Sequence, residues 1–239
     1  MLKINGLTKI YGLSDVKAVD DLSLEVESGE IFGFIGPNGA GKSTTIKCVT
    51  GITGFNAGTI EVNGFDVRKN PIEAKRSIGY VSDSHVVYDQ LTGAEYVDFM
   101  ASIYGVADKE SYKSRLENYV DVFGLKDAFN EPIKSYSHGM QQKINVIGAI
   151  IHNPPLLILD EPSAALTDIE VEGLFAIMRK LVSEGKSIIF ISHKMREVMH
   201  ISDRITILRL GEVVGTVNCA DTDGQKLANM MIGKELSES

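Results

Sequence analysis

The sequence has few cysteines, no long hydrophobic run and no excess of positive charge. Its two cysteines, Cys48 and Cys219, cannot build a disulfide framework, which favours a reducing compartment. No apolar run approaches the roughly 18 residues of a transmembrane helix, because the longest candidate, Ile144 to Leu159, is interrupted at residues 153–155. The first residues lack the apolar region of a signal peptide, so we expect neither secretion nor a membrane span.

The charge balance excludes a further class of protein. Against 24 Lys and Arg residues stand 32 Asp and Glu residues, so the formal net charge is 24 − 32 = −8. This argues against a non-specific nucleic-acid binder and against a polybasic membrane-surface protein. With 239 residues, 44% of them hydrophobic, the chain is long enough for one large domain or for a compact core with an inserted lobe.

Apolar strands alternate with helical segments along the chain. Leu22, Leu24 and Val26 alternate with polar residues, as in a half-buried antiparallel strand, whereas Ile31–Ile35 is continuously apolar, as in a central strand buried on both faces. Further strand-like runs occupy residues 59–63, 78–81, 156–159, 187–191, 205–208 and 213–217. Such alternation predicts an α/β core with a parallel sheet and an antiparallel N-terminal part.

Two capping boxes predict where helices begin. Thr92 with Glu95 and Thr167 with Glu170 have the required spacing, and Gly185 suits the end of the second helix. Helical apolar spacing follows Thr92 and continues through residues 116–123, so we expect an inserted helical lobe at roughly 88–134.

A glycine-rich loop follows the strand Ile31–Ile35 and precedes a helix. It consists of Gly36, Pro37, Asn38, Gly39, Ala40, Gly41, Lys42, Ser43 and Thr44. This GxxxxGK[ST] pattern between a strand and a helix predicts a phosphate-binding loop, in which backbone N–H groups and the helix N-terminus hold the anion. Lys42 would reach the β- and γ-phosphates, and the Ser43 hydroxyl would ligate Mg²⁺.

Two acids end the strand at residues 156–159. Asp160 can hold Mg²⁺, and Glu161 can orient and partly deprotonate an attacking water. Two acids at a strand end are usually a solvated turn, but beside a phosphate loop the functional interpretation is favoured. Ser137, before a helical run, would by itself be read only as an N-cap.

Together these motifs resemble, in order and over nearly the whole chain, the ATP-binding subunit of ABC transporters. The resemblance implies a P-loop NTPase core with a parallel sheet, an N-terminal antiparallel β subdomain and a helical subdomain at about residues 88–155. Walker A is Gly36–Thr44, and Walker B ends at Asp160, with Glu161 as the catalytic carboxylate. Ser192 and His193 match the family's switch histidine.

The resemblance also implies ligands and partners. Tyr11 would stack on adenine. The signature segment, made of Ser137, His138, Gly139 and Met140, would bind the γ-phosphate of a nucleotide held by the other subunit. ATP and Mg²⁺ are the expected cofactors. A homodimer or heterodimer of ATPase subunits and a transmembrane permease subunit are the expected partners, at the cytoplasmic face of a bacterial membrane.

Some positions depart from the family pattern. Asp83 replaces the usual Gln, and an ionised Asp accepts hydrogen bonds but does not donate them, so Asp83 could hold Mg²⁺. Up to about Pro155 the chain resembles drug and peptide exporters, but Thr167, residues 191–195 and residues 230–236 resemble monosaccharide importers. The sequence favours an export-type subunit and leaves the direction of transport and the cargo open.

Other functions account for fewer of these motifs. A P-loop small-molecule kinase or a GTPase explains neither Ser137–Gly139 nor Ser192–His193, and the chain has no Asn-Lys-x-Asp run that reads guanine. A non-transport ABC protein usually carries two fused ATPase halves or an inserted coiled coil, and neither is present here. A binding module with poor hydrolysis remains open because of Asp83 and Thr167.

Overall fold

Two β-sheets form the frame of the protein. The computed structural model describes residues 1–239 except 13–14, 84–87, 107, 165 and 234–239. Within this part a six-stranded sheet has the order β10-β9-β3-β8-β7-β6, and a four-stranded sheet has the order β2-β1-β4-β5. The mixed α/β architecture predicted from the sequence is therefore confirmed.

The larger sheet is parallel apart from one edge. Strands β3, β6, β7, β8 and β9 run parallel, and β10 pairs with β9 in the antiparallel sense. Every residue of β3, β7 and β8 is buried, as their continuous apolar runs predict. The strands are β3 (Ile31–Ile35), β6 (Ile78–Val81), β7 (Leu156–Asp160), β8 (Ser187–Ile191), β9 (Arg204–Arg209) and β10 (Glu212–Asn218).

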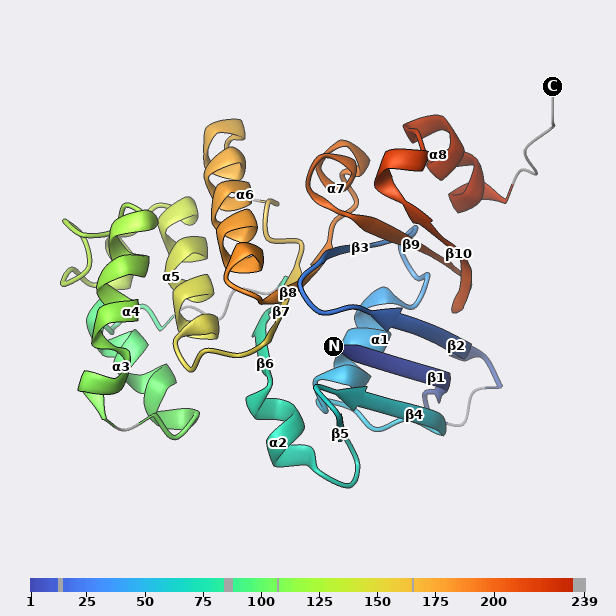
Figure 1. Ribbon diagram of the computed structural model, residues 1–239, viewed down its shortest axis with the longest axis horizontal. Helices are drawn as coiled ribbons and strands as arrows, with labels where there is room; N and C mark the ends of the chain where they lie inside the picture. Colours follow the sequence, from blue (N-terminus) through green and yellow to red (C-terminus); the bar gives the residue numbers. More distant parts are fainter. Residues whose placement is uncertain (13–14, 84–87, 107, 165, 234–239) are drawn as a thin grey trace.

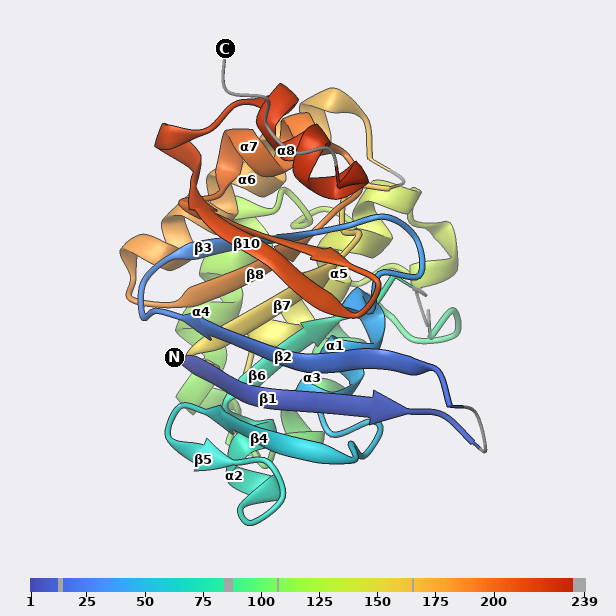
Figure 2. The ribbon, with the colours of Figure 1, turned by 90° about the vertical axis from the view of Figure 1, so that its right-hand side faces the viewer.

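The smaller sheet is antiparallel. In the view of Figure 2, its strands β2, β1 and β4 lie below β3 and β10 of the larger sheet. Its long pair β1 and β2 has several shifts of register, so the alternation of apolar residues in β1 is irregular, and the sequence did not single out this strand. The strands are β1 (Leu2–Ile10), β2 (Lys17–Val26), β4 (Ala57–Val62) and β5 (Phe65–Asp66).

Helices cover the sheets, and three of them form a lobe on one side (Figure 1). The lobe holds α3 (Gly93–Ile103), α4 (Lys109–Val122) and α5 (His138–Ile150). The other helices are α1 (Lys42–Val49), α2 (Pro71–Arg76), α6 (Asp168–Ser183), α7 (Met195–Ile201) and α8 (Gly224–Ile232). Short 3₁₀ turns occupy Ile133–Ser135 and Cys219–Asp221. No helix in the described ranges has the length and apolar character needed to cross a membrane.

Both predicted capping boxes are present. Thr92 and Glu95 begin α3, and Thr167 and Glu170 begin α6, in each case with both reciprocal hydrogen bonds. Gly185 follows α6 with a φ of +90°, as its predicted role at a helix end requires. The predicted resemblance in residues 230–236 lies partly outside the described residues, since 234–236 are not described.

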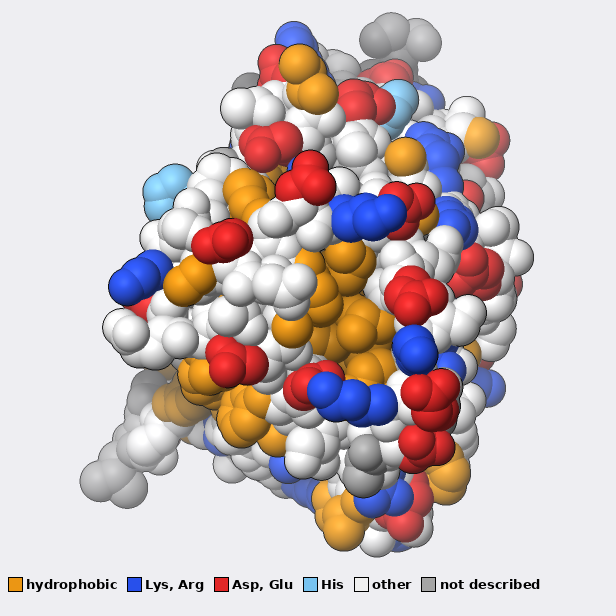
Figure 3. Space-filling model, turned by 90° about the vertical axis from the view of Figure 1, so that its left-hand side faces the viewer, with side chains coloured by type: hydrophobic (Ala, Val, Ile, Leu, Met, Phe, Trp, Pro, Cys, Tyr) orange, Lys and Arg blue, Asp and Glu red, His pale blue; other side chains and the backbone are white. Residues whose placement is uncertain are grey.

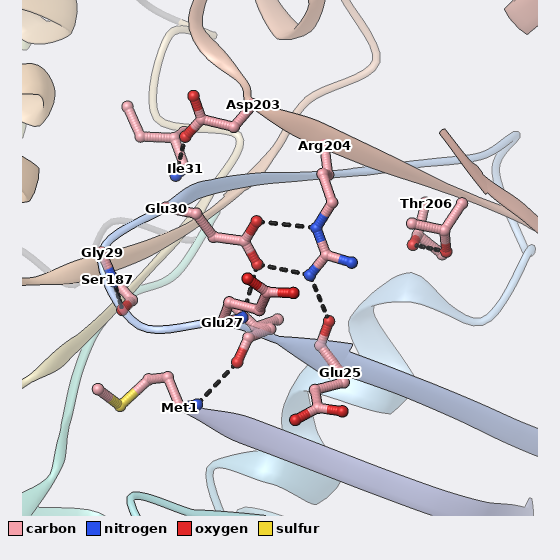
Figure 4. A network of polar contacts seen from close by, with 12 residues as sticks. Met1, Glu25, Glu27, Gly29, Glu30, Ile31, Ser187, Asp203, Arg204 and Thr206 are labelled. Carbon is pink, nitrogen blue, oxygen red and sulfur yellow. Dashed lines mark hydrogen bonds and ion pairs between the residues drawn. The ribbon is translucent and has the colours of Figure 1, made fainter. Parts of the chain in front are cut away.

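A polar network joins the two sheets at the amino end of β3 (Figure 4). Arg204 at the start of β9 donates from Nε to Glu30 Oε2 at 2.9 Å and from Nη2 to Glu30 Oε1 at 2.7 Å. The same guanidinium donates to the backbone oxygen of Glu25 in β2, and Glu30 accepts from the backbone N–H of Glu27. This network lies at the end of β3 opposite the phosphate loop, so it supports the fold away from the candidate site.

Candidate functional site

The candidate site lies where the parallel strands end. The loops after β3, β8, β7 and β6 lie next to one another in this order, because those strands are neighbours in the sheet. They carry respectively the phosphate loop, His193, the pair Asp160 and Glu161, and Asp83. The tertiary structure therefore places at one edge the residues that four separate motifs had supplied.

The phosphate loop encloses a hollow. The hollow has a volume of about 310 Å³ and is lined by residues 38–44 and by Ala18 of β2. Gly39 and Gly41 have φ values of +78° and +104°, and a Cβ atom at Gly41 would lie 2.7 Å from the backbone oxygen of Ala18. Only glycine fits at Gly41, and Ala18 is a lining residue that the sequence did not indicate.

Lys42 reaches back over the loop. Its ammonium donates to the carbonyl oxygen of Gly36 at 2.6 Å and to that of Pro37 at 3.2 Å. Burial lowers the pKa of Lys42, and the negative charges of Glu161 and Asp160 oppose this shift. The amino group thus faces both the loop and the two acids, where a phosphate chain would need a cation.

Asp160 is buried among like charges. Asp160 is only 4% exposed. Burial, followed by the carboxylates of Asp83 and Glu161, raises its pKa to about 6, while Lys42 opposes the shift. Asp83, which follows β6, therefore acts electrostatically on Asp160, and the binding of Mg²⁺ by the two residues stays a prediction. Among the described residues no cluster of three His, Cys, Asp or Glu side chains is arranged to hold a metal ion.

Glu161 and His193 contact each other directly. His193 Nδ1 lies 2.8 Å from Glu161 Oε2, and because an ionised carboxylate only accepts, the imidazole N–H donates. Glu161 has a φ of +49°, and its backbone N–H donates to the carbonyl oxygen of Ile191 at 2.9 Å. A non-glycine residue in the left-handed region is uncommon and is held there by its surroundings, here at a point of proposed chemistry.

The signature segment lies in the helical lobe, apart from α1 (Figure 1). Ser137 is the N-cap of α5, and its hydroxyl accepts from the backbone N–H of Met140 at 3.2 Å. Ser137 and His138 are exposed, Met140 is half-buried, and Gly139 is buried against the carboxylate of Glu170. The structure thus gives Ser137 the capping role, and it leaves the exposed end of α5 away from the phosphate loop of the same chain.

Tyr11 lies just beyond the end of β1. Tyr11 is 45% exposed, and the ammonium of Lys9 lies 4.8 Å from the centroid of the Tyr11 ring. The hollow of the phosphate loop is lined by other residues. The predicted contact of Tyr11 with adenine stays a prediction.

Sequence reasoning missed three polar residues that join the loops around Glu161 and His193. These residues, Ser163, Lys194 and Glu197, contact one another. The spacing of Lys194 and Glu197 at the start of a helix is a weak local sign of an ion pair. Their contact with Ser163 had no sign in the sequence, because 31 to 34 positions separate these residues.

Comparison with known proteins gives the same assignment as the geometry. A family model described as ABC transporter matches residues 19–164, more than half of the chain. The ABC transporter ATP-binding protein NatA of Bacillus subtilis (strain 168) is 36% identical, and the match covers 83% of this chain and 81% of NatA. The linearmycin resistance ATP-binding protein LnrL of the same bacterium is 35% identical, with 90% of this chain and 68% of LnrL covered.

Importer proteins match as well. The ribose import ATP-binding protein RbsA of Halalkalibacterium halodurans is 36% identical over 99% of this chain and 48% of RbsA, so the chain spans about half the length of that relative.

Solved structures share the fold. One described as an ATP-binding subunit of an ABC transporter has a TM-score of 0.85 and 28% identity, over 100% of this chain and 95% of its own. The dimeric bacterial ABC transporter cassette MJ0796 has a TM-score of 0.82 at 24% identity, over 92% of this chain and 99% of its own. The chain belongs to the family of ABC transporter ATP-binding proteins, and it is an ABC ATPase with the P-loop NTPase fold.

Proposed function

We propose that this chain binds and hydrolyses ATP as one half of an ATPase dimer, and that the cycle drives a separate membrane-spanning subunit. The observation that carries the proposal is the 2.8 Å contact between Glu161 and His193 at the sheet edge that also holds Lys42. A carboxylate, an imidazole and an ammonium at one edge are the groups that phosphoryl transfer to water requires.

ATP would bind along the phosphate loop. The residues proposed to bind ATP are Gly36, Pro37, Asn38, Gly39, Ala40, Gly41, Lys42, Ser43 and Thr44, with Tyr11 against adenine. The hollow of about 310 Å³ supports this binding, because its lining offers backbone N–H groups at the start of α1. Lys42 would exchange its two carbonyl partners for phosphate oxygens.

The residues around Asp160 suit a divalent cation. Burial, followed by the carboxylates of Asp83 and Glu161, raises the pKa of Asp160, while Lys42 opposes the shift; a bound cation would relieve the repulsion among these carboxylates. Asp160, Ser43 and Asp83 are the proposed ligands, and with so few protein ligands Mg²⁺ would share its coordination with the phosphates. When bound, Mg²⁺ neutralises charge on the phosphate oxygens.

Glu161 would orient and partly deprotonate the attacking water. His193, held by Glu161 and 63% exposed at its side chain, can turn its other ring nitrogen toward the γ-phosphate. Positioning and charge neutralisation would account for most of the rate, as is usual for phosphoryl transfer.

The place of the signature segment supports a dimer. The segment made of Ser137, His138, Gly139 and Met140 begins α5 in the helical lobe and is separated from α1 of its own chain (Figure 1). Its exposed helix N-terminus suits a phosphate, and the phosphate available to it would belong to a nucleotide on a second ATPase subunit. Two subunits facing head to tail would enclose two ATP molecules, and hydrolysis would reopen them. Both a homodimer and a heterodimer fit this arrangement.

A membrane-spanning partner would dock between the core and the helical subdomain at about residues 88–155. A hollow of about 430 Å³ lies there, and it is lined by Thr50, Ile52, Ile72, Lys75, Arg76, Ile78, Tyr80, Ile103 and Tyr104. Its lining includes Ile78 and Tyr80 of β6, the strand that precedes Asp83. The face of the lobe drawn in Figure 3 also carries hydrophobic side chains near its middle, bordered by charged ones. We place the protein at the cytoplasmic face of a bacterial membrane.

The direction of transport is proposed from the sequence alone. The signature segment and the residues up to about Pro155 favour an export-type subunit, and one relative, LnrL, is named as a linearmycin resistance protein. A sugar-import ATPase half is the alternative, supported by Thr167 and by the ribose import relatives. A non-transport ABC ATPase is the third candidate, and identifying the membrane protein that co-purifies with the chain separates all three.

The proposal is tested by replacing Glu161. The Glu161→Gln variant should lose about 10²–10⁴ of the rate of ATP hydrolysis, retain ATP binding and accumulate an ATP-bound dimer. Phosphate release and size-exclusion chromatography with ATP measure both effects. Hydrolysis by Glu161→Gln at the unmodified rate would remove Glu161 from the mechanism.

A further inference from the structure

A closed ring of contacts joins Ser163, Lys194 and Glu197, and it passes through both the hydroxyl and the backbone oxygen of Ser163. Ser163 donates from its hydroxyl to Glu197 Oε2. The other carboxylate oxygen of Glu197 lies 3.0 Å from the ammonium of Lys194, and this ammonium also donates to the backbone oxygen of Ser163 at 3.1 Å. Two of these contacts fasten the loop after β7 to the start of α7, and the third joins Lys194 to Glu197 within the start of α7.

The ring is partly buried. Ser163 is fully buried, and the side chain of Glu197 is only 16% exposed, whereas that of Lys194 is 37% exposed. A carboxylate in such a place is stable only with partners, and here each of its oxygens has one. Ser192 adds a further bond, because its hydroxyl accepts from the backbone N–H of Lys194 at 3.1 Å.

The residues of the ring are close in sequence to Glu161 and His193. Glu161 is two residues before Ser163, and His193 is directly before Lys194. The side chain of His193 is 63% exposed, so few surrounding atoms fix its place. Its distance from Glu161 therefore depends on how firmly the two loops are held together.

We propose that Ser163, Lys194 and Glu197 are positioning residues that keep His193 within hydrogen-bond reach of Glu161. This inference rests on the proposed function for its effect on catalysis, but the contact itself can be measured without turnover. Without the ring, the two loops can move apart, and His193 spends part of its time away from Glu161.

Replacing Glu197 opens the ring. We expect Glu197→Ala to lower kcat for ATP hydrolysis about 10- to 100-fold, since misplacing a catalytic group by about 1 Å has effects of this size. The dissociation constant for ATP should stay unchanged, because the phosphate loop is not part of the ring. Lys194→Ala should lower kcat in the same way, and Lys194→Arg should restore it, since Arg keeps the charge and the donors. Lys3→Ala removes an exposed ion pair with Glu25 in the other sheet and is the matched control.

A double-mutant cycle separates positioning from a general loss of stability. In a His193→Ala background, Glu197→Ala should cause no further fall in kcat, because there is no imidazole left to position. An equal fall in kcat in both backgrounds, or a fall in melting temperature with unchanged kcat, would overturn the proposal.

The state of His193 gives a readout that needs no turnover. In the unmodified protein its Nδ1–H should show the low-field proton resonance of a hydrogen-bonded imidazole, and Glu197→Ala should lose that resonance. Its persistence in Glu197→Ala would overturn the inference even if ATP hydrolysis is normal. Absence of hydrolysis in the unmodified protein would instead contradict the proposed function, and the resonance would still decide the positioning role.

Discussion

Gly139 lies directly against the carboxylate of Glu170, so that a side chain at Gly139 would overlap Glu170 Oε1. This carboxylate is fixed, because it accepts from the backbone N–H of Thr167 and from its hydroxyl, each at 3.0 Å. The signature segment at the start of α5 is therefore packed on the capping box that starts α6. Glycine at this position serves the packing within one chain, in addition to the role proposed for it toward a second subunit.

We expect Gly139→Ala to destabilise the chain by about 1 kcal/mol, because the methyl group displaces Glu170 and disrupts the cap. In a Glu170→Ala background the same change should be neutral or stabilising, since alanine favours a helix over glycine. Urea unfolding of the four chains measures both values. Gly173→Ala is the control: Gly173 lies inside α6 with open space around it, so its replacement should be stabilising. Equal effects of Gly139→Ala in both backgrounds would contradict the packing argument.

Lys42→Ala should abolish detectable ATP binding. The side chain of Lys42 is half-buried beside the phosphate loop, and its ammonium donates to the carbonyl oxygens of Gly36 and Pro37. Its loss removes the main side-chain cation from a site that also contains Asp160 and Glu161. Titration with a fluorescent ATP analogue measures the affinity, and an unchanged affinity would refute the phosphate-loop assignment.

Arg204→Met should lower the free energy of unfolding by about 3 kcal/mol, because it leaves Glu30 buried without its bidentate partner. The double variant Glu30→Gln with Arg204→Met should recover part of this loss, since no buried charge remains. The residual ATPase rate of the folded protein should not change, because the pair lies at the opposite end of β3 from the phosphate loop. Denaturant unfolding together with phosphate release tests the separation of stability from activity.

His152 predicts a pH dependence of stability. Its ring stacks on Tyr104 at 3.6 Å between centroids, Nε2 lies 3.1 Å from the carbonyl oxygen of Ile78, and burial lowers its pKa to about 4. The unfolded chain binds a proton on this residue below about pH 6.5, and the folded chain does so only near pH 4. The contribution of His152 to stability is therefore complete above about pH 6.5 and is lost as the pH falls toward 4.

The His152→Gln variant keeps a donor toward Ile78 but cannot take up this proton. Its melting temperature should fall less than that of the unmodified chain between pH 6.5 and 4. Parallel pH profiles of the two proteins would assign the acid sensitivity to other groups. The test is specific because His152 contacts the first residue of β6, whereas Asp83 and Asp160 lie at the opposite ends of the parallel strands β6 and β7.

Local patterns in the sequence predicted the structure correctly where interactions between residues close in the chain determine it. The strands β3, β6 and β8 have the bounds that their apolar runs predict, and both capping boxes form. The short helices α2 and α7 and the C-terminal α8 were not predicted, because helices of six to nine residues depend on packing more than on their own pattern.

The sequence by itself determined the phosphate loop and the acids at the end of β7, because each of these depends on residues that are adjacent in the chain. It determined the family through the order of several such motifs along the chain. Only the tertiary structure decided that His193 contacts Glu161, that Glu197 closes a ring with Ser163, and that Gly139 packs on Glu170. These contacts join residues 31 to 34 positions apart, and their geometry depends on which strands are neighbours in the sheet. Strand order is set by the burial of both sheet faces together, and no short segment contains that information.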